Sequence, residues 1–216
     1  MKYIIMCGGE YRQWEQPRHF IEFKGEPLIK RTIRLLKEAG VEDIAISSTN
    51  PMFEGLGVPV LKHKNKYTNG EDDHLWTEAF YPSDEPTCYI CGDVFFSPEA
   101  IKTIVEADTK SIDFFASAPP FSPQYAKDHA EPFAFKVVNQ AYFRHCIDIV
   151  QFLYREGHFL RQPIAWELWQ VIKKTPINHI DYTNYTAIND YTCDIDTPSD
   201  LDVLKNKIGG GRWQIT

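Results

Sequence analysis

Apolar and polar positions follow one another along the chain in blocks of two kinds. Short apolar runs predict buried strands, whereas apolar residues spaced three or four apart predict amphipathic helices. Residues 2–7 (KYIIMC) form the first run of the strand type. The segment 27–40 is the first of the helix type, with Pro27 suited to its first turn and Gly40 to its end.

The remaining blocks continue this alternation to the end of the chain. Strands are predicted at 42–48, 57–63, from 88 to Gly92-Asp93, and at 113–118, 133–138 and 177–182, and helices near 74–81 and at 97–107, 140–157, 163–174 and 198–208. Strands that alternate with helices indicate parallel βαβ units with helices on both faces of the sheet. The predicted fold class is therefore α/β, a single-domain Rossmann-like α/β/α sandwich with a mostly parallel sheet.

The domain is expected to span residues 1–208 as one unit, with a flexible tail at 209–216. A proline-rich loop is the one candidate boundary inside it. Because long ordered loops in compact domains are usually functional, we interpret the region of about 118–135 as an insertion beside the site.

Composition narrows the functional classes. The net charge of -7 argues against a nucleic-acid partner, which would favour a basic face. No apolar run approaches the ~20 residues of a membrane span, and the apolar start is too short for a signal peptide, so the cytoplasm is the expected location. Cys88 and Cys91 lie three apart on one predicted strand and face opposite sides, so buried apolar cysteines are expected rather than a metal site.

The first candidate site follows the first strand. In an open α/β sheet, ligands bind outside the carboxyl ends of the strands. Here Gly8-Gly9 is followed by Arg12 and by Pro17-Arg18. Glycines let backbone N–H groups approach phosphate oxygens, and arginines add charge-assisted hydrogen bonds. An ordinary turn and a phosphate cradle both stay open for this segment.

Two acidic segments complete the pattern. Asp93 follows the central strand, where a carboxylate suits Mg²⁺ or a simple turn. Asp194 and Asp196 alternate with an apolar residue, which places both carboxylates on one face of an extended segment. A cap for the helix that begins at Pro198 is the alternative interpretation. His19, His63 and His74 show no ligand spacing and are expected to be structural or surface residues.

Together these segments resemble the nucleotidylyltransferases with a glycosyltransferase-A-like fold. The first loop resembles the glycine, arginine and proline pattern of that family, and residues 23–29 (FKGEPLI) resemble its GxPLI entry into the first helix. Residues 39–44 are similar to its AGVxDI segment, and residues 194–201 (DIDTPSDL) to the DxDTPEDL ending of its cytidylyl- and molybdopterin-type branches. The likeness covers nearly the whole chain in the same order.

The resemblance implies transfer of an NMP group from an NTP to a phosphorylated acceptor, such as a sugar phosphate, with release of pyrophosphate. It implies Mg²⁺ as the cofactor, bound by Asp93, Asp196 and Asp194. The catalytic residues would be Arg12, Arg18 and Asp93, the nucleotide-binding residues Cys7, Gly8, Gly9, Arg12, Gly70 and Gly92, and the acceptor-binding residues Glu131 and Lys136. The expected partners are the NTP and the acceptor, without nucleic acid or membrane, and a homodimer stays open.

Two other functions remain in competition with this hypothesis. A glycosyltransferase of related fold would use a nucleotide sugar, although it usually carries Asp-x-Asp where this chain has Asp93-Val94-Phe95. A non-catalytic nucleotide-binding domain is the second alternative. Two departures from the family pattern support this alternative: Glu10 stands where the family has glycine, and Arg18 stands where it has lysine.

Overall fold

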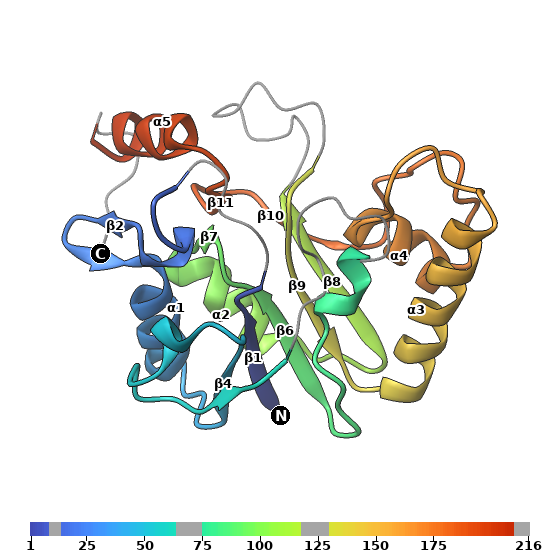
Figure 1. The fold of residues 1–216 in the computed structure, drawn as a ribbon, viewed down its shortest axis with the longest axis horizontal. Helices are drawn as coiled ribbons and strands as arrows, with labels where there is room; N and C mark the ends of the chain where they lie inside the picture. The colour runs from blue at the N-terminus through green and yellow to red at the C-terminus, as the bar shows by residue number, and fades with distance from the viewer. Residues whose placement is uncertain (9–13, 64–74, 118–129, 210–216) are drawn as a thin grey trace.

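A seven-stranded sheet runs through the centre of the molecule in the computed structural model (Figure 1). The structure describes residues 1–8, 14–63, 75–117 and 130–209. The strand order is β10-β8-β9-β6-β1-β4-β5. These strands are β1 Lys2–Met6, β4 Ile44–Ser47, β5 Val60–Leu61, β6 Thr87–Cys91, β8 Ile112–Ser117, β9 Pro132–Val137 and β10 Thr186–Ile188.

Six of the seven strands run in one direction, and β9 runs against both of its neighbours. Met6 is opposite Ser47 on one side and Cys91 on the other, so the carboxyl ends of β1, β4 and β6 lie at one edge of the sheet. The predicted α/β fold with a mostly parallel sheet is confirmed. The segments that follow these strands, which the sequence marked as candidate sites, therefore start from the same edge.

Helices cover both faces of the sheet (Figure 1). Helices α1 (Leu28–Glu38) and α2 (Pro98–Glu106) lie on one side, and α3 (Gln140–Arg155) and α4 (Ala165–Lys173) on the other. Each side has its own core of buried side chains, because alternate residues of the strands point to opposite faces. Ser97 caps α2, since its hydroxyl accepts a hydrogen bond from the amide of Ala100, as predicted.

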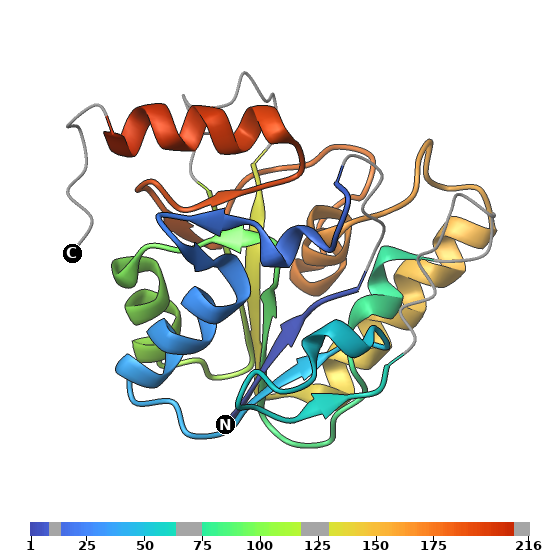
Figure 2. The ribbon, with the colours of Figure 1, turned by 60° about the vertical axis from the view of Figure 1, so that its left-hand side comes forward.

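A third core lies beyond the carboxyl edge of the sheet. Helix α5 (Pro198–Gly209) packs there over two short ribbons, β2 (Glu22–Phe23) with β3 (Glu26–Pro27) and β7 (Val94–Phe95) with β11 (Cys193–Asp194) (Figure 2). The buried side chains of this third core include Leu28, Phe95, Ile195 and Leu204. This small core holds the segments around Asp93 and Asp194 against each other.

Two predicted elements differ from the structure. The helix expected near 74–81 is a short 3-10 turn, η3 (Trp76–Ala79), and η1 (Arg18–Phe20) and η2 (Pro51–Phe53) are turns of the same kind. The strand predicted at 177–182 is wrong, and the strand of this region is β10 instead. Side chains of α4 use the backbone carbonyl groups that a sheet would need, because Gln170 donates to His179 O and Lys173 to Asp181 O.

The cysteines are free thiols, and Cys88 is fully buried as expected. Among the described helices, none has the length and apolar character needed to cross a membrane.

Candidate active site

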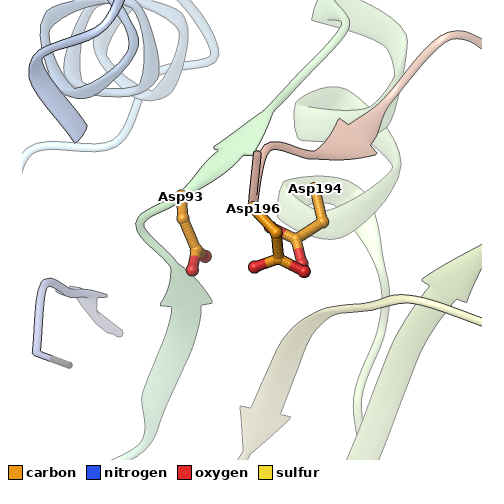
Figure 3. A group of neighbouring side chains, drawn as sticks. All are labelled: Asp93, Asp194 and Asp196. Carbon is orange, nitrogen blue, oxygen red and sulfur yellow. The ribbon is translucent and has the colours of Figure 1, made fainter. Parts of the chain in front are cut away.

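Three carboxylates meet at the carboxyl edge of the sheet. Asp93 lies in the link between β6 and β7, Asp194 ends β11, and Asp196 follows it (Figure 3). The antiparallel pair β7–β11 places Asp194 opposite Val94, and the amide of Ile195 donates to Asp93 O at 3.1 Å. As a result, one oxygen from each of the three carboxylates lies within 4.8 Å of the others.

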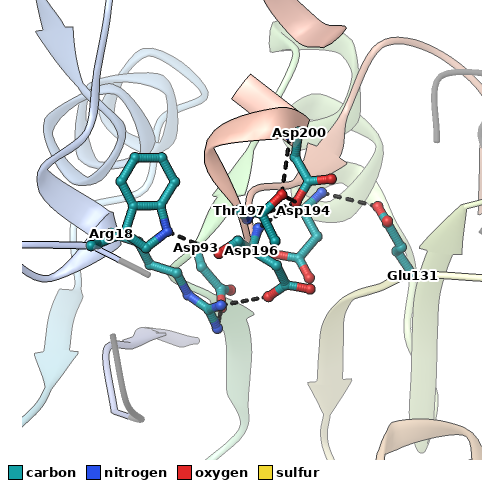
Figure 4. A network of polar contacts seen from close by, with 8 residues as sticks. Arg18, Asp93, Glu131, Asp194, Asp196, Thr197 and Asp200 are labelled. Atoms are coloured by element: carbon teal, nitrogen blue, oxygen red, sulfur yellow. Dashed lines mark hydrogen bonds and ion pairs between the residues drawn. The ribbon is translucent and has the colours of Figure 1, made fainter. Parts of the chain in front are cut away.

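Arg18 bridges two of these carboxylates (Figure 4). Its Nη1 donates to Asp196 Oδ1 at 2.5 Å, and its Nη2 donates to Asp93 Oδ2. The guanidinium group is partly buried, with 21% of the side chain exposed. The predicted phosphate-binding arginine therefore contacts the predicted metal ligands directly.

The position of Arg18 depends on tight packing beneath it. The next residue, His19, is buried and packs edge-on against Phe53. It also lies against Gly92, where a Cβ atom would come within 2.5 Å of Met6 O and 2.8 Å of both Cys7 Sγ and His19 Cδ2. Since a backbone oxygen cannot move aside, position 92 requires glycine for this close approach.

The segment that carries Asp196 is held at both of its ends. The indole Nε1 of Trp14 donates to Asp196 O at 2.9 Å. Asp200 Oδ2 accepts hydrogen bonds from the amides of Asp196 and Thr197, while the amide of Asp200 donates to Thr197 Oγ1. Thr197 and Asp200 thus form a capping box at the start of α5. The predicted cap exists, but it belongs to Thr197 and leaves the Asp196 carboxylate to face Arg18.

Glu131 comes to the same place from the first residues before β9. It is 2% exposed, and its Oε2 accepts a hydrogen bond from the amide of Asp194 at 3.0 Å. Its own amide donates to Ser117 Oγ at 2.8 Å. This predicted acceptor residue thus lies beside the carboxylates and positions β11.

The three aspartates differ in their electrostatic environment. Burial raises the pKa of Asp194 well above its usual range, and the charges of Asp93 and Asp196 raise it further. Burial also raises the pKa of Asp93, but the charge of Arg18, the influence of His19 and the hydrogen bonds to the carboxylate together outweigh this effect, so the net pKa is lowered. One guanidinium group therefore does not compensate three carboxylates.

A divalent cation fits this set of side chains. Oδ1 of Asp194 is buried and has no hydrogen-bond partner among the described residues. All of the candidate ligands are carboxylate oxygens, the hard donors that Mg²⁺ prefers. A cation there would supply a partner for the Asp194 oxygen and would neutralise the mutual repulsion of the three groups.

Other residues proposed for the site have separate positions. Lys136 is 5% exposed. In the antiparallel register of β6 and β9 it lies opposite Cys88, near the start of β6 and at the edge of the sheet away from the carboxylates. Its Nζ donates to the carbonyl groups of Ile104, Val105 and Ala107 at the end of α2. The structure therefore does not bring Lys136 to the acidic cluster. Its side chain is buried, so it is not an exposed strand lysine either.

The glycine-rich segment is only partly described. Gly8 follows β1 at the site edge, Cys7 is fully buried, and the amide of Gly92 donates to Met6 O. Gly9, Arg12 and Gly70 lie outside the described residues. Sequence reasoning missed the role of Trp14. The available signal was the position of this tryptophan next to a candidate phosphate loop.

The Rossmann-like sheet thus brings a cation-fitting carboxylate cluster and an arginine together at its carboxyl edge. The chain belongs to the family of MobA-like NTP transferase domains, which it matches over residues 3–151. The predicted family is thereby confirmed, and with it the prediction of an enzyme that transfers nucleotidyl groups. A comparison with curated proteins gave no match.

Solved structures share the fold over nearly the full chain. One is the CTP:phosphocholine cytidylyltransferase LicC of Streptococcus pneumoniae, with 16% identity, a TM-score of 0.56, and 96% of this chain and 98% of that chain covered. The inositol-1-phosphate CTP transferase of T. maritima has 17% identity and a TM-score of 0.54, covering 97% and 96%. A protein of Bacillus anthracis assigned as a glucose-1-phosphate thymidylyltransferase has 14% identity and a TM-score of 0.58, covering 94% and 93%.

Proposed function

We propose that the chain is a Mg²⁺-dependent nucleotidylyltransferase that moves an NMP group from an NTP to a phosphorylated small-molecule acceptor and releases pyrophosphate. The observation that carries this proposal is the cluster of Asp93, Asp194 and Asp196 beside Arg18, at the sheet edge where this family's first loop begins. The acceptor class follows the three similar structures, whose names give phosphocholine, inositol 1-phosphate and glucose 1-phosphate as substrates.

The acidic, basic and glycine residues of the site have different roles in this proposal. Asp93, Asp194 and Asp196 would hold Mg²⁺, which when bound neutralises negative charge on phosphate oxygens. Arg18, together with Arg12, would bind the triphosphate, and the amides of Gly8 and Gly9 would approach it closely. The acceptor phosphate is itself the nucleophile. The protein therefore needs to position two anions in line and to stabilise their charge, and it needs no nucleophile of its own.

Glu131 lies on the acceptor side in this assignment. The Glu131 carboxylate accepts a hydrogen bond from the amide of Asp194. An acceptor that contacts Glu131 would therefore be one hydrogen bond away from β11, which carries a proposed cation ligand. Neither the base of the NTP nor the particular acceptor follows from these contacts.

The test is an assay of pyrophosphate release over the four NTPs and a panel of phosphorylated acceptors that includes sugar phosphates, alditol phosphates and aminoalkyl phosphates. We expect one pairing to give Mg²⁺-dependent turnover. In that pairing Asp93→Asn should lower kcat/KM at least 100-fold, because it removes a cation ligand and a partner of Arg18.

Asp108→Asn is the matched control, since Asp108 is an exposed carboxylate whose partner is Lys110 and whose loss leaves the site intact. Full turnover by folded Asp93→Asn would refute the assignment of the site. Release of a nucleoside diphosphate from a nucleotide sugar, without any pyrophosphate, would replace the proposal with a glycosyltransferase.

A further inference from the structure

Arg18 occupies the position in the acidic cluster that a divalent cation would compete for. Its two terminal nitrogens contact different carboxylates, Asp93 and Asp196, instead of binding one carboxylate with both. The same two carboxylates supply two of the three oxygens that lie within 4.8 Å of one another. A guanidinium group and a divalent cation repel each other, so both cannot be held at full strength by these side chains.

In this arrangement Arg18 does not use all of its hydrogen-bonding capacity. Its Nε is buried and has no acceptor among the described residues. A buried N–H group without an acceptor is costly. Guanidinium groups bind phosphate oxygens with parallel N–H donors, so a phosphate that met the Nε edge of Arg18 would satisfy this group.

The residue next to Arg18 is fully packed, whereas the Arg18 side chain itself is partly exposed. The neighbouring His19 is 1% exposed, whereas 21% of the Arg18 side chain is exposed. A long side chain on a fixed base can turn its head from one anion to another without a change of backbone. From one anchor, the Arg18 head group contacts the carboxylates in this structure and could turn to an incoming phosphate.

We infer that Arg18 is an internal counter-ion that competes with the divalent cation for Asp93 and Asp196, and that the triphosphate draws it away. This inference rests on the proposed function and concerns the order of binding in the same site. The cation alone binds weakly, the triphosphate alone must break the arginine ion pairs, and each binds better in the presence of the other. Such coupling is reciprocal by thermodynamic necessity.

The first experiment titrates Mn²⁺ alone into the full-length protein, with binding followed by electron paramagnetic resonance. Arg18→Gln should bind Mn²⁺ at least tenfold more tightly than the wild type, and Arg18→Lys should be intermediate. Arg34→Gln is the matched control, because Arg34 also pairs with two carboxylates, Glu26 and Glu38, and its loss changes the net charge equally. Its Mn²⁺ affinity should equal that of the wild type.

Asp93→Asn separates the two hypotheses. If it leaves Mn²⁺ binding intact, the metal site and the proposed function both fail. If it abolishes binding while Arg18→Gln and Arg18→Lys bind no more tightly than the wild type, the competition is overturned and the proposed function stands.

The second experiment measures the binding of inorganic tripolyphosphate in EDTA by calorimetry. Asp196→Asn frees one end of Arg18, whereas Asp194→Asn changes a neighbouring carboxyl group that makes no hydrogen bond to Arg18. We expect tripolyphosphate to bind at least threefold more tightly to Asp196→Asn than to Asp194→Asn. Equal affinities in the two variants would show that release of Arg18 from Asp196 does not favour tripolyphosphate binding, and would overturn the inference.

Discussion

Arg18 and His19 are adjacent in the chain and have opposite electrostatic roles. The carboxylates around Arg18 raise its pKa despite burial, so it keeps its charge. For His19, burial dominates and lowers the pKa to about 4, and the charge of Arg18 acts in the same direction. A neutral ring below a charged guanidinium group keeps the anchor of Arg18 uncharged over most of the accessible pH range.

A pH dependence of stability follows from His19. An unfolded histidine binds a proton below about 6.5, whereas folded His19 does so only below about 4. The unfolded state therefore binds more protons between these values, and stability falls as the pH is lowered from 6.5 towards 4. The loss from this one group is about 3 kcal/mol when complete.

Urea unfolding of the wild type and His19→Gln from pH 7 to pH 4 measures this effect. The variant should lose less stability over that range by a difference of up to about 3 kcal/mol. His158→Gln, at an exposed position, is the control and should follow the wild type. Parallel pH profiles for the wild type and His19→Gln would contradict the assignment.

At the residue scale, the sequence predicted the carboxylates but not their contacts. Asp194 and Asp196 were recognisable from alternation, and Asp93 from its place after a strand. The ion pairs of Arg18 join positions 75 and 178 residues apart, and no local spacing reports such distances. The buried Glu131 could be named from the family pattern, but its bond to the amide of Asp194 required the tertiary structure.

At the scale of elements, Lys136 links the central sheet to the end of α2. Its ammonium group donates to three carbonyl groups there, where the helix leaves backbone acceptors unpaired and the helix dipole is negative. Lys136 thus acts as a cap supplied by a neighbouring strand.

Replacement of this lysine separates a structural role from a role in acceptor binding. Lys136→Met should lower the free energy of unfolding by about 2 kcal/mol, since three carbonyl groups that are buried or partly buried lose their donor. The KM for the acceptor should not change below the melting temperature. Denaturant unfolding and steady-state kinetics measure the two quantities, with the exposed Lys110→Met as the control. A raised acceptor KM with unchanged stability would return Lys136 to the site.

Elements with strong local signals were predicted well. Proline and serine at the starts of α1 and α2 fix where these helices begin, because capping is a property of a few adjacent residues. The segment 177–182 alternates like a strand, but α4 supplies its hydrogen bonds through side chains, which overrides the local pattern. Tertiary partners decided this case.

At the scale of the whole molecule, the three hydrophobic cores of the described residues differ in their relation to the site. The cores on the two faces of the sheet build the scaffold, whereas the third core, under α5, holds the ribbons that carry Asp93 and Asp194. Damage to the third core should therefore reach the site, and comparable damage behind α4 should not.

Two equivalent cavities test this difference. Leu204 in α5 and Leu168 in α4 are both 0% exposed, and alanine at either position should cost about 2–5 kcal/mol. Only Leu204→Ala should also weaken Mn²⁺ binding several-fold at a temperature where both variants are folded. Calorimetric titration measures the affinity, and equal weakening by both variants would contradict a local link between α5 and the carboxylates.

The reversed strand β9 has a consequence for how this fold can diversify. Because β9 runs against β8, the chain leaves the carboxyl edge at Ser117 and returns to it at Glu131, and the two residues are joined by hydrogen bonds between Ser117 N and Glu131 O and between Glu131 N and Ser117 Oγ. The two ends of the intervening sequence are thus held together by this pair of hydrogen bonds. Lengthening such a segment costs little free energy, since the closure entropy of a loop grows only slowly with its length. Descendants of this chain could therefore carry a longer or shorter sequence between Ser117 and Glu131 without any alteration of the sheet.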